Sequence, residues 1–230
     1  MSYPLPRARE SRISVLAFDL DGTLVDSAPG IVATVNDVVT EWGFAPAPVA
    51  AVQALIGLPL DIFWQRFTTL PATEWPALTD RYRVIYRENA IPKIGLFPNV
   101  RDVIEALHAA GYTLTIASSK ITPVSSAVLQ HVGLLQPFRL LMGNDSVTQP
   151  KPHAEMLQRT LAHCGVSPDA ALMIGDTTHD IALGVNAGVR TVAVANGTHE
   201  YATLAAAQPT ALIKTLSELP AVLTQLAAQW

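Results

Sequence analysis

Short apolar runs alternate with amphipathic stretches along most of this chain, and the alternation predicts its architecture. Residues 13–18 form an apolar run that is typical of a strand buried on both faces. Similar runs predict strands at 113–117, 138–142, 170–174, 191–195 and 211–213. Apolar residues at helical spacing predict helices at 100–110, 123–132, 154–164, 181–187 and 219–229. Because strands and helices alternate, we predict an α/β fold with a parallel sheet and helices on both faces.

One long segment interrupts this alternation. Its apolar spacing is helical, with predicted helices at 29–42, 60–67 and 78–89, and no strand signal intervenes. We therefore expect an α/β core formed by residues 13–26 and 93–230, and a helical insert formed by residues 27–92. Residues 1–12 are expected to be a flexible N-terminal tail.

The composition narrows the class of protein. Of the 230 residues, 50% are hydrophobic and 15% are charged, as in a compact globular protein. The net charge of −4 offers no electrostatic basis for binding nucleic acid, and no apolar segment approaches the length of a bilayer span. The single cysteine, Cys164, fits a reducing compartment. We therefore expect a cytoplasmic monomer or weak homodimer that binds neither nucleic acid nor membranes.

Carboxylates follow two of the predicted strands. Asp19 and Asp21 stand at the end of the first strand, where like charges repel unless a cation or a donor lies between them. Asp176 and Asp180 follow the strand predicted at 170–174. If these strands are parallel neighbours, all four carboxylates converge at one edge of the sheet. Such an all-oxygen cluster suits a hard divalent ion, and Mg²⁺ in particular, which points to phosphoryl chemistry.

Four segments together resemble the haloacid dehalogenase-like hydrolase superfamily, close to its phosphoglycolate phosphatase branch. In the family's order they are Asp-Leu-Asp-Gly-Thr-Leu at 19–24, Thr-Ile-Ala-Ser-Ser-Lys at 115–120, Lys151-Pro152, and Gly-Asp-Thr-Thr-His-Asp at 175–180. The resemblance implies a Rossmann-like core and a helical-bundle cap hinged near Asp26 and residues 91–97. It also implies a Mg²⁺-dependent phosphatase that hydrolyses a small phosphorylated metabolite, similar to phosphoglycolate, through an aspartyl-phosphate.

The two aspartates of the first segment are the candidate catalytic residues. Asp19 is the candidate nucleophile, because a carboxylate that attacks phosphorus divides one difficult hydrolysis into two easier steps. Asp21 is the candidate general acid and base. The resemblance implies that both also bind the metal, Asp21 through its backbone carbonyl.

Phosphoryl transfer also needs donors and a metal to balance negative charge on the transferred group. The resemblance implies that Ser118, Ser119 and Lys151 bind the phosphate. It implies that Asp176 is a direct metal ligand, and that Asp180 is either a second ligand or a carboxylate that orients metal-bound water or Lys151. A carboxylate at a helix N-terminus can also simply interact favourably with the helix dipole. Asp180 can do this and take part in the metal site at the same time.

Several functions remain open from the sequence. A phosphomutase of the β-phosphoglucomutase type would carry a basic residue soon after Gly57, where this chain has Leu-Pro-Leu, and a dehalogenase would lack Asp21. An inorganic pyrophosphatase and a catalytically inactive phosphate-binding protein are further alternatives. The substrate is not specified: phosphoglycolate, pyrophosphate, a sugar phosphate and a nucleoside monophosphate all fit. Candidate specificity residues on the predicted insert helices are Arg66, Arg83 and Arg87.

Overall fold

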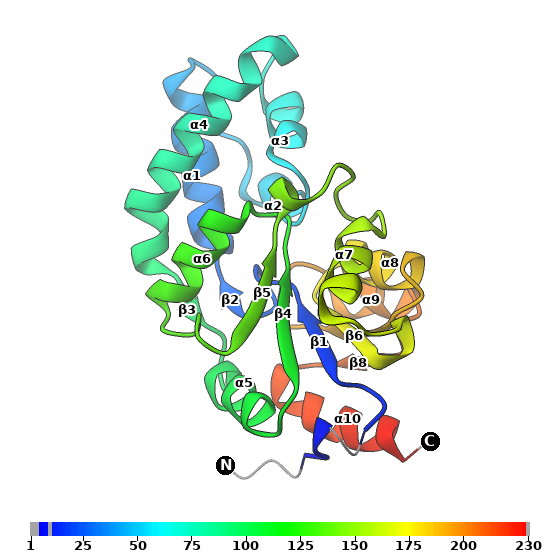
Figure 1. Ribbon diagram of the computed structural model, residues 1–230. Coiled ribbons are helices and arrows are strands. Elements are labelled where there is room, and N and C mark those ends of the chain that lie inside the picture. Colours follow the sequence, from blue (N-terminus) through cyan, green and yellow to red (C-terminus); the bar gives the residue numbers. More distant parts are fainter. Residues whose placement is uncertain (1–4, 9–10, 229–230) are drawn as a thin grey trace.

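Within residues 5–8 and 11–228, which the computed structural model describes, six parallel strands form a central sheet (Figure 1). In spatial order the strands are β5 (Phe138–Met142), β4 (Thr113–Ala117), β1 (Val15–Phe18), β6 (Ala171–Gly175), β7 (Arg190–Val194) and β8 (Ala211–Ile213). Because all neighbouring strands are parallel, their carboxyl ends lie at one edge. The predicted α/β fold with a parallel sheet is confirmed.

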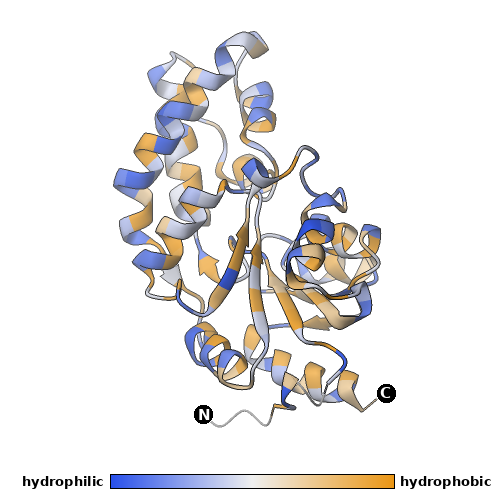
Figure 2. Ribbon diagram, viewed as in Figure 1, coloured by the Kyte–Doolittle hydropathy of each residue, from blue (hydrophilic) through white to orange (hydrophobic). Residues whose placement is uncertain are grey.

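Helices cover both faces of the sheet, and the residues of β1 show why. Leu16 and Phe18 pack in a core cluster with residues of α5, α6 and α10, whereas Val15 and Ala17 pack with α7 and α8. Successive side chains of a strand point to opposite faces, so a strand covered on both sides is apolar along its length, as β1 is in Figure 2. The helices of the core are α5 (Val100–Ala109), α6 (Thr122–His131), α7 (Glu155–Cys164), α8 (Thr178–Asn186), α9 (Tyr201–Ala206) and α10 (Leu219–Ala227).

The insert leaves and rejoins the core at a pair of very short strands. β2 (Val25–Asp26) and β3 (Gly95–Leu96) pair antiparallel, and the insert lies between them. Helices α1 and α4 pack against each other in the insert, which stands above the sheet in Figure 1. Its elements are α1 (Ala28–Glu41), α2 (Val49–Gln53), α3 (Leu60–Phe67), α4 (Trp75–Ile85), a π-helical turn (Tyr86–Ala90) and 3-10 turns at Ala72–Glu74 and Ile91–Lys93.

Two helices of the insert differ from the prediction. The helix predicted at 78–89 begins earlier, at Trp75, and gives way to the π-helical turn at Tyr86. Pro76 lies in the first turn of α4, where its missing N–H leaves no intrahelical bond unmade. Helix α2 was not predicted, because Val52 is the one buried residue among its five and leaves no periodic pattern. The remaining 3-10 turns lie in the core, at Asn144–Ser146, Pro168–Ala170 and Leu216–Glu218.

Part of the N-terminal segment contacts the core. Ala8 is buried and its amide donates to the carbonyl oxygen of Ala110 at 3.1 Å, and Arg12 forms an ion pair with Asp169. The flexibility expected of residues 1–12 stays a prediction, since residues 1–4 and 9–10 lie outside the described part of the chain. In the part that is described, no helix combines the length and apolar character that a membrane span requires.

Candidate active site

Three predicted site residues follow directly after three adjacent strands. Asp19 follows β1, Ser118 follows β4 and Asp176 follows β6, and β1 lies between the other two. The amide of Asp19 donates to the carbonyl oxygen of Ile174 at 2.8 Å, which continues the sheet register to this edge. Asp180 joins them from the first turn of α8. Carboxylate oxygens of Asp19, Asp176 and Asp180 lie within 4.8 Å of one another, so the predicted convergence is found for these three.

Asp176 is held by groups that point at its carboxylate from two loops. Its Oδ1 accepts from the hydroxyl of Thr23 at 2.9 Å, and its Oδ2 accepts from the amide of Thr198 at 2.6 Å. Gly22 approaches so closely that a Cβ there would overlap the carboxylate, and its φ of +81° also favours glycine. Burial and the charge of Asp180 raise the pKa of Asp176 to about 7, against the opposing effect of the two donors.

Lys151 supplies a positive charge inside the acidic cluster. Its Nζ lies 2.8 Å from Oδ1 of Asp19 and 2.6 Å from Oδ1 of Asp180. Burial alone would lower the pKa of Lys151, but the carboxylates of Asp180 and Asp19 outweigh burial and raise it, so the amine stays charged. The pKa of Asp19 is raised by burial and by its acidic neighbours, although Lys151 acts in the opposite direction.

The cluster fits a divalent metal ion. Three carboxylates and one lysine leave a net charge of −2 when all are ionised, and all three acidic residues are buried. Burial is the main cause of the raised pKa values of Asp19 and Asp176, and the neighbouring carboxylates raise them further. Hard oxygen ligands with excess negative charge are what Mg²⁺ prefers.

Asp21 does not join this cluster with its side chain, which corrects the expectation that four carboxylates converge. Its Oδ1 accepts from the hydroxyl of Ser27, and its Oδ2 lies 2.6 Å from Nζ of Lys120. Nζ of Lys120 also lies 4.6 Å from the ring centroid of Tyr86. The Asp21 carboxylate is therefore balanced by a lysine amine and a hydroxyl donor within the described residues. Lys120 was missed as a functional residue, although it ends the segment 115–120.

The two serines after β4 have different surroundings. Ser118 is buried beside Asp19 and Asp21, and its hydroxyl accepts from the amide of Lys120 at 3.2 Å. The hydroxyl of Ser119 donates to the carbonyl oxygen of Gly57 at 2.5 Å, so it ties the core to the insert. Phosphate binding by Ser119 stays a prediction, and the structure gives its hydroxyl another partner.

A family of haloacid dehalogenase-like hydrolases matches residues 16–194 of the chain. The chain belongs to this family. The probable phosphatase IndB of Dickeya dadantii is 35% identical to this hydrolase over 209 residues, which cover 89% of this chain and 91% of the relative. The phosphoglycolate phosphatase of Salmonella paratyphi A is 31% identical over 229 residues, covering 89% and 90%. A crystal structure of a predicted phosphoglycolate phosphatase from Haemophilus somnus superposes with a TM-score of 0.86 at 26% identity, covering 92% of this chain and 98% of that one.

These similarities confirm the resemblance seen in the sequence. The hydrolase is a phosphatase of the haloacid dehalogenase-like family, similar to phosphoglycolate phosphatases, and acts on phosphoric monoesters.

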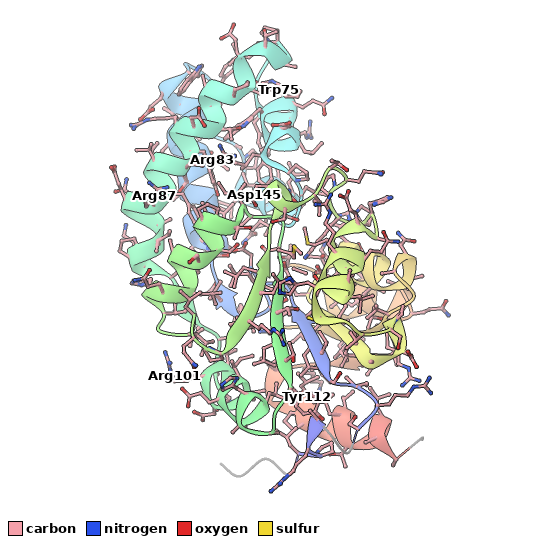
Figure 3. The ribbon with its side chains drawn as sticks, viewed as in Figure 1. Trp75, Arg83, Arg87, Arg101, Tyr112 and Asp145 are labelled. Carbon is pink, nitrogen blue, oxygen red and sulfur yellow. The ribbon has the colours of Figure 1, made fainter. Side chains whose placement is uncertain are left out.

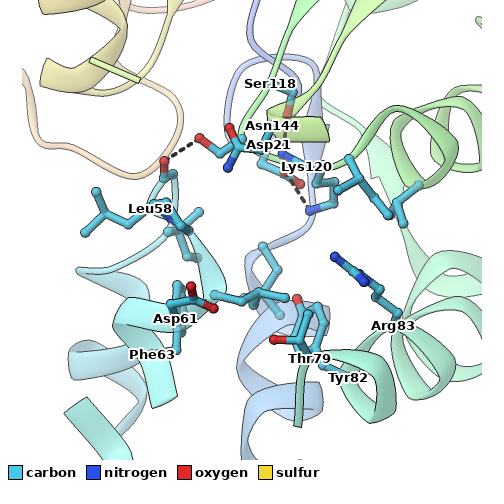
Figure 4. A pocket seen from close by; sticks show the side chains of 18 of the residues that line it. Asp21, Leu58, Asp61, Phe63, Thr79, Tyr82, Arg83, Ser118, Lys120 and Asn144 are labelled. Carbon is cyan, nitrogen blue, oxygen red and sulfur yellow. Dashed lines mark hydrogen bonds and ion pairs between the residues drawn. The ribbon is translucent and has the colours of Figure 1, made fainter. Parts of the chain in front are cut away.

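A cavity of about 210 Å³ lies between the acidic edge of the hydrolase core and its insert (Figure 4). Asp19, Asp21, Ser118 and Lys120 line it from the core side. Of the three arginines proposed from the sequence, Arg83 is the one that lines the cavity within the described residues. Figure 3 shows Arg83 and Arg87 on neighbouring turns of the insert. The insert side of the wall is formed by Ile31, Ile56, Gly57, Leu58, Pro59, Leu60, Asp61, Phe63, Thr79, Tyr82 and Arg83.

Proposed function

We propose that this hydrolase is a Mg²⁺-dependent phosphatase that cleaves a small phosphomonoester, with phosphoglycolate-like compounds as the starting class, through an aspartyl-phosphate on Asp19. The observation that carries the proposal is the surroundings of that carboxylate. Asp19 lies at the floor of the cavity, 2.8 Å from a buried lysine amine and within 4.8 Å of two further carboxylates. Nothing in a purely structural role for Asp19 requires this cluster of opposed charges at a cavity.

The residues around Asp19 divide the work of the reaction. In the first step a carboxylate oxygen of Asp19 attacks phosphorus, the ester P–O bond breaks, and Asp21 gives its proton to the alcohol oxygen that leaves. In the second step water attacks the same phosphorus and gives a proton to Asp21, the P–O bond to Asp19 breaks, and phosphate leaves the free carboxylate. Lys151 keeps Asp19 oriented, and the buried hydroxyl of Ser118 is a donor for the phosphoryl oxygens.

Asp19, Asp176 and Asp180 would hold the Mg²⁺ ion, with the backbone carbonyl of Asp21 as a further ligand. When bound, the ion would neutralise charge on the phosphoryl group and on the carboxylates. In this arrangement Asp180 would both hold the ion and orient the amine of Lys151. Its Oδ1 accepts from Lys151, and its Oδ2 accepts from the amide and hydroxyl of Thr177 at 3.0 and 2.7 Å, so its direction is fixed.

We also propose that residues 27–92 act as a cap domain that closes over the cavity, with hinges near Asp26 and at residues 91–97. The pairing of β2 with β3 supports this, because both connections to the core run through one small element. A closed cap would exclude bulk water while the aspartyl-phosphate forms. The cytoplasmic location and the monomeric or weakly dimeric state stay predictions that the lone cysteine and the composition support.

Hydrolysis of para-nitrophenyl phosphate, followed across a Mg²⁺ titration and after chelation, tests the function. We expect activity that requires Mg²⁺, and one added phosphoryl group on Asp19 in intact-mass spectra of rapidly quenched enzyme. Asp19→Asn should form no such adduct, because an amide oxygen is a poor nucleophile. Near-normal turnover by Asp19→Asn would refute the covalent mechanism. Absence of turnover would favour an inactive phosphate-binding protein, and isomerisation of a sugar phosphate or cleavage of pyrophosphate would favour the mutase or the pyrophosphatase.

A further inference from the structure

The cavity wall opposite the nucleophile offers almost no polar side chains over one continuous segment. Residues 56–60 read Ile-Gly-Leu-Pro-Leu, and all five line the cavity. The backbone of this segment is also largely engaged. The carbonyl oxygen of Gly57 accepts from Ser119, the amide of Leu58 donates to the carbonyl oxygen of Leu55 at 3.0 Å, and Pro59 has no N–H. A leaving group packed against this segment meets apolar surface.

Aromatic side chains form two further parts of the same wall (Figure 4). Phe63 and Tyr82 line the cavity and are both buried. Tyr82 stacks on Tyr86 with a centroid distance of 5.5 Å and meets the edge of Trp64 at 6.1 Å, so its ring is held in place. A ring fixed in this way can pack against a ligand ring with little further loss of conformational entropy.

The positive charges at the cavity are already engaged by acidic residues. Lys120 and Arg83 are the two cations among the described lining residues. Lys120 pairs with Asp21 at 2.6 Å, and Nη1 of Arg83 lies 3.2 Å from the carboxylate of Asp80. The carboxylate of Asp61, on the insert, also lines the cavity (Figure 4). A leaving group with its own carboxylate would therefore compete with Asp21 for Lys120 and would meet the negative charge of Asp61.

We infer, on the basis of the proposed function, that the preferred substrate is a phosphomonoester of a neutral alcohol that carries one aromatic or heteroaromatic ring. The ring packs against Leu58, Leu60, Phe63 and Tyr82, while the phosphoryl group lies at Asp19. The volume of about 210 Å³ is smaller than the roughly 300–1,000 Å³ of typical drug-sized sites, which favours a leaving group with a single ring. Two-carbon phosphoglycolate would leave most of this apolar wall in contact with water.

Steady-state kinetics with four substrates at saturating Mg²⁺ tests the inference. The panel is pyridoxal 5′-phosphate, uridine 5′-monophosphate, glycerol 3-phosphate and 2-phosphoglycolate. At least one ring-bearing ester should exceed both ringless esters in kcat/KM by about tenfold or more, the usual discrimination of an apolar pocket. In Leu60→Gln the advantage of the ring-bearing ester over glycerol 3-phosphate should fall by about tenfold, mainly through KM. Tyr82→Leu, which keeps an apolar side chain but removes the ring, should reduce the same ratio.

The matched control is Ile62→Gln. Ile62 lies on the same helix as Leu60, but it is 37% exposed and does not line the cavity. This variant should keep the wild-type ratio of kcat/KM for the ring-bearing ester to kcat/KM for glycerol 3-phosphate. A best kcat/KM for 2-phosphoglycolate, together with its loss in Arg83→Ala, would overturn the inference and leave the phosphatase function intact. An unchanged ratio in Leu60→Gln would also overturn it. Failure of the function itself is separate: no ester would be hydrolysed, and no phosphoryl adduct would form on Asp19.

Discussion

Removing the buried amine at position 151 tests how the acidic cluster is stabilised. In Lys151→Met the carboxylates of Asp19 and Asp180 lose a donor that lies 2.8 and 2.6 Å away. The Lys151 side chain is 2% exposed, so water cannot replace it without rearrangement. Breaking a buried ion pair from one side costs about 3–5 kcal/mol. At about 2–4 °C per kcal/mol for a chain of this size, Tm in the presence of EDTA should fall by roughly 6–20 °C.

Arg81→Met is the control, because it removes an ion pair of the same length at the surface. Two nitrogens of Arg81 lie 2.7 Å from the carboxylate oxygens of Glu41, but the side chains are 42% and 41% exposed. Water solvates both groups after the substitution, so the shift in Tm should be much smaller. Both variants are unfolded by heat and by urea in EDTA. Equal losses of stability in the two would refute the argument that burial sets the size of the effect.

Three further predictions concern the metal site, the proposed general acid Asp21 and the turn that precedes Lys151. Burial raises the pKa of Asp176 from 3.8 to about 7, so the metal-free folded state binds more protons than the unfolded chain and loses stability as pH rises through that range. Mg²⁺ should therefore raise Tm most near pH 7 and above, and Asp176→Asn should reduce this increase in Tm. A Tm that does not change across a Mg²⁺ titration would exclude the proposed metal site. Asp21→Asn should lower kcat by roughly 10²- to 10⁴-fold and accumulate phosphoenzyme from an activated ester, as measured by rapid quench. Glu155 accepts hydrogen bonds from the amide and hydroxyl of Thr148 at 3.1 and 2.8 Å, in the turn before Lys151, so Glu155→Gln should lower kcat with little change in KM. An equal effect on KM would contradict that positioning role.

The core strands could be predicted from the sequence because they are short apolar runs, and β1, β4, β6 and β7 are buried almost throughout. The strands at 113–117, 138–142 and 211–213 match the predicted bounds. Strands β2 and β3 could not be predicted, because two residues cannot show a period. Helix α9 was missed for a related reason: Leu204 is its one buried residue, so no apolar stripe marks it.

The parts of the candidate site that could be predicted are the side chains that the parallel sheet alone brings close together. Residues that follow adjacent parallel strands must meet, which brings Asp19 and Asp176 together. The partner of Asp21 was not predictable in this way. Lys120 reaches it from the loop after β4, with its amine over the ring of Tyr86 in the insert, and no local pattern encodes that contact. The same limit applies to Ser119, whose hydrogen bond to Gly57 spans core and insert.

Because β2 pairs with β3, the two chain connections between the insert and the core lie side by side. Val25 lies opposite Leu96 and Asp26 opposite Gly95, so the chain departs and returns through neighbouring backbone positions. Whatever lies between two such adjoining ends can be shortened, lengthened or exchanged without moving the strands that carry the aspartates. Recombination at this junction could therefore supply the same catalytic edge with a different substrate wall. The hydrogen bond from Ser27 to Asp21 marks one insert side chain near the junction that such an exchange would have to retain.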